Sequence, residues 1–376
     1  MKDTKLGRTG LDVSVIGIGT EHLMGQPRET VVSTLRQAID LGVNYFDLIF
    51  SFPEYLSNMS AAFLGYRERV LLTAHLGSTE RKGQYYKSRS VSRCESYFLN
   101  YLSELGTDHV DVLFLHNFNS INDWHTIARP GGVLDLARRL REEGKARFLG
   151  ISGHYPGVLE SAIETGLVDV VMFPVNMFSH AMPGRKELLE LCARQQIGVV
   201  AMKPFGGGKL LNKRGKFRVP KYQTSGEAYE ARINSEISPT QCLSYVLSQI
   251  GVSIALPGVK NGTELAAALQ LLEAGEEEQD FGDLLAEFGR YVEGECVYCN
   301  HCLPCPAAID IGQVNRLLDA AQLGITESLR RAYHALPVTA SACTECGVCV
   351  ERCPFGVEVV ARMKQAAEIF EPVLVS

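Results

Sequence analysis

Short apolar runs alternate along most of the chain with longer, helix-like stretches. The eight apolar runs, rich in Val, Ile, Leu and Phe, cover residues 13–19, 43–48, 69–77, 109–116, 147–152, 169–175, 197–204 and 252–258. Nearly continuous hydrophobic runs of this length are typical of parallel strands that are buried on both faces of a sheet. The helix-like stretches between them include residues 28–42, 132–144, 185–196 and 238–251, and several of these close on glycine, a common helix stop.

Eight consecutive β-then-α units predict an α/β fold, a (β/α)8 TIM barrel, over residues 12–272, with a small hairpin before it. An open doubly wound sheet is the alternative. Periodicity alone does not exclude it, although eight units without a break favour closure.

The composition shifts at the acidic stretch EEEQD, residues 276–280. We therefore expect a barrel domain over residues 1–280 and a second domain over residues 281–376, which the helical pattern at 283–294 leads into.

The overall composition narrows the class of protein. The chain has 376 residues, 46% hydrophobic and 21% charged, with a net charge of −6. These values are ordinary for a globular protein and do not favour nucleic acid or a membrane surface as partner. The first ten residues, MKDTKLGRTG, have no apolar core of a signal peptide, and no apolar run approaches the length of a membrane span. A cytoplasmic location is the expectation.

The cysteines carry the most specific pattern in the sequence. Eight of the eleven lie between Cys296 and Cys353. Residues 343–354 read C-x2-C-x2-C-x3-C-P, the bacterial ferredoxin run, and residues 296–306 are a variant that is one residue shorter. In such runs three thiolates bind one cluster and the cysteine before proline binds the other. The spacing predicts a helical, ferredoxin-like domain with two [4Fe–4S] clusters.

The predicted ligand sets follow from that rule. One cluster takes Cys296, Cys299, Cys302 and Cys353, and the other takes Cys343, Cys346, Cys349 and Cys305. Two alternatives stay open: zinc knuckles, which rarely have four cysteines in a row with a trailing proline, and a single cluster with one vestigial run.

Polar side chains gather where the predicted barrel strands end, which is the face that carries chemistry in such barrels. These residues are Glu21, His22, Asp47, His75, His116, Asn117, Ser152, His154, Asn176 and Lys203. Each histidine alone is more often structural, but four of the nine histidines at one face, with an aspartate, indicate a site. A metal held by these histidines is a minority hypothesis, because no ligand spacing specifies one.

Six segments in order, KLGRTGLDVSVIGIGT, GVNYFD, DVLFLH, RFLGISGH, MKPFGGG and ALPGVKN, resemble the aldo/keto reductases. With the cysteine tail, the chain resembles the ferredoxin-fused branch of that superfamily along nearly its whole length. The resemblance implies a (β/α)8 barrel that reduces carbonyls with NAD(P)H through an Asp, Tyr, Lys, His tetrad. In that tetrad the tyrosine, its pKa lowered by the lysine, is the general acid.

This sequence departs from the tetrad at two of its four positions. Asp47 matches the aspartate and His116 the histidine, but Phe52 stands at the tyrosine position and His75 at the lysine position. The family's glutamine and tyrosine of the sixth strand, which hold the nicotinamide, are replaced by Met172 and Val175. The departures predict that tyrosine-dependent hydride transfer is lost.

The phosphate end of the cofactor site is better retained. The predicted cofactor-binding residues are Ser152, Lys203, Gly206, Gly207, Gly208 and Lys260. Glycine N–H groups and a lysine suit a phosphate, although the glycines would equally suit a tight turn. NADP(H) therefore stays open with half of its site replaced, and a flavin is not excluded.

The favoured hypothesis is an iron–sulfur oxidoreductase that passes electrons through two [4Fe–4S] clusters to or from a small organic substrate in the barrel. Its expected catalytic residues are Asp47, which orients a histidine, and His75 and His116, one of which is the general acid. Tyr55, three residues past Phe52, is a less favoured acid.

Two alternatives remain. One is an ordinary NAD(P)H-dependent reductase, and the other is a non-catalytic electron-transfer or assembly subunit of a larger redox complex. For the latter, the loop 209–221, with six basic residues, would steer an acidic ferredoxin, a flavodoxin or a partner redox enzyme. A solvated surface loop explains the same charges. The sequence does not name the substrate.

Overall fold

The computed structural model describes residues 1–180, 182, 184–211, 216–219, 229–232, 236–281, 284, 296, 300, 302–321, 325, 327–353 and 356–371. The chain divides into two compact units. The first comprises Met1–Glu80, Lys87–Phe217 and Ala231–Tyr291, and the second Arg81–Tyr86, Arg218–Glu230 and Val292–Ser376. The predicted helix at 283–294 lies outside the described residues except for Leu284, and the boundary near residue 280 stays a prediction.

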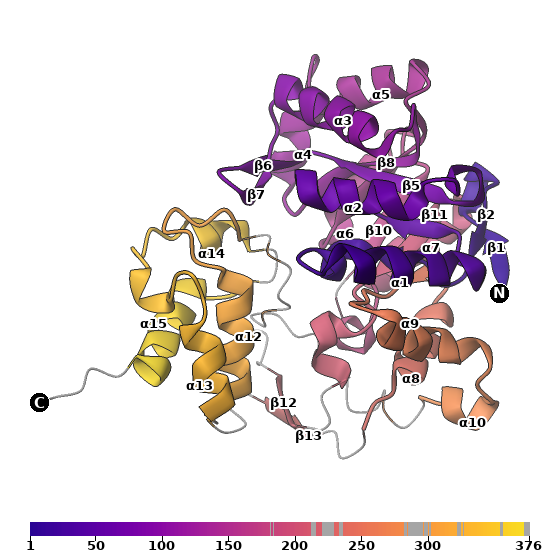
Figure 1. Ribbon diagram of the computed structural model, residues 1–376. Coiled ribbons are helices and arrows are strands. Elements are labelled where there is room, and N and C mark those ends of the chain that lie inside the picture. Colours follow the sequence, from indigo (N-terminus) through magenta and orange to yellow (C-terminus); the bar gives the residue numbers. More distant parts are fainter. Residues whose placement is uncertain are drawn as a thin grey trace, which may run out of the picture. The chain divides into compact units, whose positions relative to one another are not determined.

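Eight parallel strands form the barrel of the first unit (Figure 1). They are β3 (Ile18–Gly19), β4 (Tyr45–Asp47), β5 (Leu71–Leu76), β8 (Val110–Phe118), β9 (Ala146–Gly153), β10 (Val170–Pro174), β11 (Gly198–Met202) and β14 (Val252–Leu256). Each pairs with the next in this order, and bridges from Ile16 to Ala255 and from Gly19 to Gly258 join the first strand to the last. The predicted TIM barrel is confirmed, and each strand falls within one of the eight apolar runs or overlaps it.

A hairpin of β1 (Asp3–Lys5) and β2 (Asp12–Ser14) covers the N-terminal end of the barrel. Leu6, Leu11 and Val13 join the apolar cluster that fills the barrel interior. The side chain of Leu6 lies directly over Gly198, where β11 begins. The first predicted strand, residues 13–19, was therefore partly wrong, because Val13 pairs with Thr4 in the hairpin rather than with a barrel strand.

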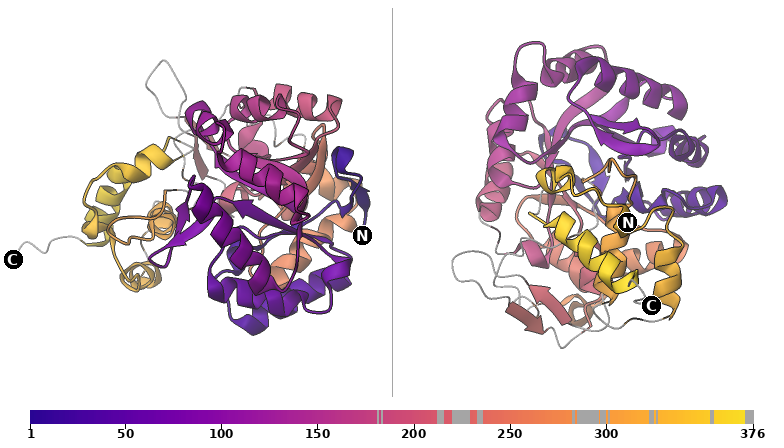
Figure 2. Two further views of the ribbon diagram at one scale, coloured as in Figure 1. Left: turned by 90° about the horizontal axis from the view of Figure 1, so that it is seen from above. Right: turned by 90° about the vertical axis from the view of Figure 1, so that its left-hand side faces the viewer.

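Helices cover the outer face of the strands (Figures 1 and 2). They are α1 (Arg28–Asp40), α2 (Pro53–Phe63), α3 (Val91–Leu105), α4 (Ile121–Ala128), α5 (Val133–Glu142), α6 (Pro156–Ile163), α7 (Arg185–Arg194), α8 (Pro239–Leu247) and α9 (Gly262–Leu269). The short helix α10 (Glu276–Gln279) packs against α8. In α5 the buried residues Val133, Leu136, Ala137 and Leu140 recur at helical spacing on one face. In α8 a Ser238 and Gln241 capping box satisfies the first turn.

Short elements connect these helices and strands. They are the hairpins β6 (Ser78–Arg81) with β7 (Gln84–Lys87) and β12 (Lys216–Val219) with β13 (Tyr229–Arg232), and the 3-10 turns η1 (Gly7–Thr9), η2 (Thr20–Leu23), η3 (Arg67–Arg69), η4 (Met177–Ser179), η5 (Gly206–Leu211) and η6 (Gln270–Leu272). Within the described part of the chain, no helix combines the length and the apolarity that a membrane crossing requires.

The alternation of side chains along each strand places the site. Tyr45 and Phe114 belong to the apolar cluster inside the barrel. Two residues further on, and therefore on the same side of the strand, come Asp47 and His116. The polar residues are thus the layer above the apolar core, toward the C-terminal mouth of the barrel.

The second unit has its own small helical core. Its helices are α12 (Ile311–Ala321), α13 (Glu327–His334), α14 (Val348–Arg352) and α15 (Val359–Phe370), with the turn η8 (Ala340–Ala342). Helix α12 packs against α15 (Figure 2), and the rings of Tyr333 and Phe370 stack with centroids 4.3 Å apart. Arg362 of α15 donates hydrogen bonds to Asn315 and Asp319 of α12. The helical character predicted for this region is confirmed.

Candidate functional site

Three buried side chains from neighbouring strands form one hydrogen-bonded chain. Oδ1 of Asp47, at the end of β4, lies 2.9 Å from Nε2 of His75 in β5. The other ring nitrogen of His75, Nδ1, lies 3.0 Å from Nδ1 of His116 in β8. Asp47 is 6% exposed, His75 7% and His116 1%. The structure thus brings together the three residues predicted to be catalytic.

The strand register explains why these residues meet. Asp47 pairs with Thr73, so the Thr73 hydroxyl donates to Asp47 Oδ1 at 2.6 Å. His75 pairs with Phe114, and their rings stack with centroids 5.2 Å apart. The stacked ring of Phe114 thereby fixes the plane of the His75 ring. His116, two residues further along the same strand, then lies within hydrogen-bond distance of Nδ1 of His75.

The direction of these hydrogen bonds follows from the carboxylate. An ionised Asp47 only accepts, so Nε2 of His75 carries a hydrogen. A neutral His75 then has Nδ1 as its acceptor, and Nδ1 of His116 donates to it. The ring nitrogen of His116 that does not face His75 is Nε2.

Phe52, at the N-cap of α2, and Tyr55, in its first turn, are the two residues compared with the tyrosine position above. Phe52, half-buried at the start of α2, has no proton to give and lies against Phe50, with ring centroids 5.5 Å apart. The hydroxyl of Tyr55 is buried 2.5 Å from Oγ1 of Thr20. Burial raises the pKa of Tyr55 far above the usual range of a phenol. The geometry gives Tyr55 a packing role.

A second polar chain crosses the mouth from β11 to β8. The Lys203 ammonium donates to Nε2 of His154 at 2.9 Å. Nδ1 of His154 donates to Oδ1 of Asn119 at 2.9 Å, and Nδ2 of Asn119 donates to Oδ1 of Asn117 at 2.7 Å. Burial, together with the positive charges of Lys203, His116 and Lys87, holds the pKa of His154 well below its ordinary value. His154 is therefore a neutral imidazole that accepts from a cation.

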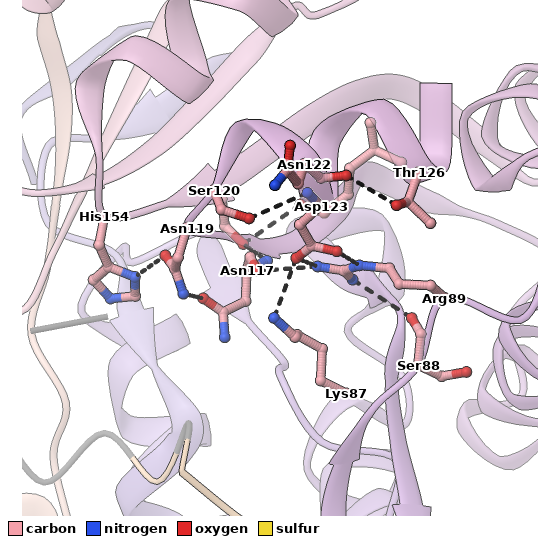
Figure 3. A network of polar contacts seen from close by, with 12 residues as sticks. Lys87, Ser88, Arg89, Asn117, Asn119, Ser120, Asn122, Asp123, Thr126 and His154 are labelled. Atoms are coloured by element: carbon pink, nitrogen blue, oxygen red, sulfur yellow. Dashed lines mark hydrogen bonds and ion pairs between the residues drawn. The ribbon is translucent and has the colours of Figure 1, made fainter. Parts of the chain in front are cut away.

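An ion pair anchors the other end of this chain (Figure 3). Arg89 donates two 2.7 Å hydrogen bonds to the carboxylate of Asp123 and a third, at 3.0 Å, to the backbone oxygen of Asn117. Lys87 lies 3.2 Å from the same carboxylate. Although burial opposes ionisation, Arg89 and Lys87 hold the pKa of Asp123 below its usual range.

Three of the predicted cofactor residues make hydrogen bonds within the fold. Oγ of Ser152 accepts from the backbone N–H of Asn117 at 2.9 Å, which ties β9 to β8. The N–H groups of Gly206 and Gly208 donate to backbone oxygens of Lys203 and Phe205 within their own turn. These groups serve the fold in the described structure, which is the tight-turn role that the sequence left open.

The remaining positions of that cofactor site are apolar or exposed. Met172 belongs to the apolar cluster inside the barrel, and Val175 is fully buried. Lys260 is exposed beside α9, and Gly207 has a backbone φ of 71° that suits glycine.

The other strand-end residues are dispersed. His22 packs its ring against Gly258, and Glu21 is half-buried. Asn176 donates to the backbone oxygen of Lys203 at 2.9 Å. Three of the four predicted histidines interact: His75 lies within hydrogen-bond distance of His116, and His116 acts electrostatically on His154. Both ring nitrogens of His75 and of His154 already have partners, and the described residues hold no group of three or more His, Cys, Asp or Glu side chains arranged for a single metal ion.

The cysteines of the second unit line a common cavity. Cys302, Cys305, Cys343, Cys346 and Cys349 all face it. The rest of its wall is almost entirely apolar and includes Ile309, Ile311, Val360 and Met363. Several thiols over an apolar wall, with few competing oxygen ligands, fit an iron–sulfur cluster. Cys296 and Cys353 pack on the edge of the same helical core, and Cys299 lies outside the described residues.

Comparison with known proteins identifies both units. Residues 15–286 match the aldo/keto reductase family, and residues 295–358 match a 4Fe-4S dicluster domain. The chain belongs to the aldo/keto reductase family. It is an oxidoreductase in which the family barrel is followed by an iron–sulfur domain, as the resemblance implied.

Curated relatives and solved structures agree with this class. The chain is 25% identical over 291 residues to an uncharacterized oxidoreductase, YqkF, of Bacillus subtilis (strain 168), covering 73% of this chain and 92% of the relative. It is 28% identical over 244 residues to the NADH-specific methylglyoxal reductase of Escherichia coli (strain K12), covering 58% and 72%. The aldo-keto reductase AKR11C1 from Bacillus halodurans (holo form) superposes with a TM-score of 0.62 at 20% identity, covering 77% of this chain and 98% of that one.

Several polar residues of the site were not predicted from the sequence. Thr73 stands two residues before His75 in its strand, and that inward alternation could have revealed it. Asn119, Arg89 and Asp123 follow no local pattern, because their contacts join segments 28 to 35 residues apart.

The Thr73 hydrogen bond gives a stability prediction. Thr73→Val keeps the shape of the side chain but removes a donor from the buried Asp47 carboxylate, so we expect a loss of roughly 1–3 kcal/mol in unfolding free energy. Anaerobic urea unfolding followed by the emission of Trp124, the only tryptophan and part of the barrel unit, measures it. The control is Thr126→Val, whose exposed hydroxyl bonds only Asn122 within α4. Equal stability of the two variants would contradict the assigned role.

The neutral His154 predicts a loss of stability in acid. Because its folded pKa lies below the ordinary value of 6.5, the unfolded chain binds a proton that the folded chain does not as the pH falls below that value. The contribution of neutral His154 to the unfolding free energy is therefore fully present above about pH 6.5. Below that pH the unfolding free energy falls by up to about 1.4 kcal/mol per pH unit. His154→Gln should flatten this slope between about pH 7.5 and about pH 5.5, again by Trp124 emission, while the exposed His125→Gln keeps it. Identical slopes in wild type and His154→Gln would refute the neutral state.

Proposed function

We propose that the chain is an iron–sulfur oxidoreductase that passes electrons to or from a small organic substrate in the barrel mouth, with His116 as proton donor and acceptor. The observation that carries this proposal is the continuous chain from Asp47 through His75 to His116. This chain supplies a group that can donate a proton, whereas Phe52, at the tyrosine position, cannot donate one.

The relay provides what acid catalysis of a carbonyl requires. Reduction of a carbonyl to an alcohol consumes two electrons and two protons. His116 gives the first proton from Nε2 to the substrate oxygen, and its Nδ1 hydrogen stays directed at His75. The charge of protonated His116 is stabilised through His75 by the Asp47 carboxylate. Solvent then reprotonates Nε2, and the second proton goes to the carbonyl carbon, where the two electrons form the new C–H bond. Oxidation of an alcohol would use the same steps in reverse.

The thiols would hold two [4Fe–4S] clusters in the predicted sets. The cavity is lined by all four cysteines of the second set, Cys305, Cys343, Cys346 and Cys349, together with Cys302 of the first set, and the match to a dicluster domain supports a pair of clusters. When bound, each cluster supplies or accepts one electron, so the pair covers the two electrons of the reaction. A ferredoxin or flavodoxin is the class of partner that delivers electrons singly.

Loss of the tyrosine-dependent hydride mechanism follows from the same residues. His75 binds Asp47 and faces His116 rather than a phenol. The turn hydrogen bonds of Gly206 and Gly208 also argue against a phosphate of NADP(H), or of a flavin, in that loop. The second candidate is an NAD(P)H-dependent reductase, favoured by the likeness to the methylglyoxal reductase of Escherichia coli.

The histidine relay predicts the effect of two substitutions. With reduced methyl viologen as one-electron donor and a panel of small aldehydes, ketones and 2-oxo acids, His116→Gln should lower kcat/KM by about 100-fold or more, because the proton donor is lost. His75→Gln should also lower it, because Asp47 no longer reaches His116. The exposed His125→Gln is the control. Wild-type turnover in His116→Gln would remove it as the proton donor, and a wild type that is inactive alone but purifies with a catalytic subunit would favour the non-catalytic alternative.

The ligand sets predict the iron content. Anaerobically purified protein should contain about eight iron and about eight sulfide per chain, and Cys346→Ala should lose about half of each. Iron and sulfide analysis with electron paramagnetic resonance of the reduced protein measures this. Cys94→Ala, in α3 of the barrel unit, should keep the full content. About four iron atoms per chain in the wild type would indicate a single cluster and contradict the predicted pair.

A further inference from the structure

One arginine of the barrel unit is buried without an acidic partner. Arg185, the first residue of α7, is 4% exposed. Its Nη2 donates to the hydroxyl of Tyr245 at 3.0 Å and to Oε1 of Gln249 at 2.8 Å. No carboxylate of the described residues forms an ion pair with it. A buried charge is ordinarily paired, so this guanidinium calls for an explanation.

The groups around Arg185 do not neutralise it. Gln249 is a neutral amide, and burial raises the pKa of Tyr245 to about 12 although Arg185 opposes the rise, so the Tyr245 hydroxyl is a neutral phenol. The Tyr245 ring adds a cation–π contact, 5.9 Å from Cζ to the centroid, which offsets only part of the cost of burying a charge. Glu187, the acid in the first turn of α7, acts on Glu160 of α6 instead.

The place of Arg185 in α7 adds to this cost. The N-terminus of a helix carries a partial positive charge, which disfavours a cation and favours an anion. Helix α7 has ten residues and begins after Gly184, which has no side chain to cap the first N–H groups. An anion at this position would offset both the burial of the guanidinium and its place at the positive end of the helix.

Two nitrogens of the guanidinium are not used by the protein. Nε is buried and has no hydrogen-bond partner. Nη1 also makes no hydrogen bond within the described part of the chain, but it is not among the fully buried atoms without a partner, so it reaches solvent. An anion can therefore approach Nη1 without displacing Tyr245 or Gln249, which both bind Nη2.

His180, between η4 and α7, responds to the same charge. Its Nδ1 lies 2.9 Å from the Tyr245 hydroxyl, which accepts from Arg185 and donates its own hydrogen to His180. Partial burial and the charge of Arg185 lower the pKa of His180, and Arg185 is the one charged group in the described ranges that acts on it. An anion at Arg185 would cancel that effect and raise the pKa of His180.

We propose that Arg185, at the start of α7, binds an oxyanion, the chemistry that phosphate and carboxylate groups share. The planar guanidinium suits either group, and the positive end of α7 adds to the attraction. Tyr245 and Gln249 hold the plane of the guanidinium, so their role is positioning. The site shares no residue with the relay from Asp47 to His116 and does not depend on the proposed function.

Stability as a function of anion concentration tests the site. Anaerobic urea unfolding of the full-length protein, followed by Trp124 emission, is measured in potassium phosphate or potassium acetate, with potassium chloride keeping the ionic strength constant. An anion that binds only the folded state raises the unfolding free energy once its concentration exceeds Kd. We expect this rise with at least one probe, and the probe that acts distinguishes phosphate from carboxylate. General salt effects appear in chloride and in every variant, so they cancel in the comparison.

Substitutions assign the effect to Arg185. Arg185→Gln should weaken the apparent Kd by about tenfold or more, yet cost little stability without the anion, because it removes a buried unpaired charge. Arg185→Lys should keep the effect at lower affinity, since the charge remains and the planar fork is lost. Arg194→Gln, exposed at the end of α7, is the matched control. An equal anion response in wild type and Arg185→Gln, or no response of the wild type to either probe, would overturn the proposal.

A second measurement needs only the wild type, should Arg185→Gln not fold. With ¹³C-labelled histidine, and His180→Gln to assign its signal, NMR follows the titration of His180 in phosphate, acetate and chloride. We expect the pKa of His180 to be higher in the anion that stabilises the protein than in chloride. An unchanged pKa in both anions would contradict binding at Arg185.

Discussion

The hydrogen bond between Asp47 and His75 is the constraint from which the rest of the site follows. A carboxylate this deeply buried requires donors, and it has two on one oxygen, Thr73 and His75. Once Nε2 of His75 is committed to Asp47, Nδ1 of His75 must accept, and His116 donates to it. His75 therefore links the Asp47 carboxylate to His116.

The barrel holds this arrangement rigidly. The three residues come from adjacent strands β4, β5 and β8, with the ring of Phe114 beneath His75. Asn117, in an irregular stretch near the end of β8, and Lys203, just after β11, have left-handed backbone conformations, and each is held by a hydrogen bond from a neighbouring strand end. The mouth thus holds two hydrogen-bonded chains, one from Asp47 to His116 and one from Lys203 to Asn117.

The sequence predicted the barrel because parallel strands buried on both faces leave long apolar runs. It misassigned Val13, since an apolar run does not say which strand it pairs with. Asp47, His75 and His116 were recognisable as strand ends, but their direct contact depends on the register between strands. The contact of Lys203 with His154 spans 49 residues and has no local pattern. Cysteine spacing, by contrast, is local, so the iron–sulfur domain was predictable while its boundary near residue 280 remains a prediction.

The central claim is that the barrel takes protons from histidines and electrons one at a time, rather than hydride from a nicotinamide. Stopped-flow mixing of the anaerobic, cluster-loaded protein with a reduced ferredoxin, or with NADPH or NADH, tests it through the cluster absorbance. The account predicts rapid bleaching by the reduced ferredoxin and none on the same timescale by either nicotinamide. Rapid bleaching by NADPH or NADH would contradict it.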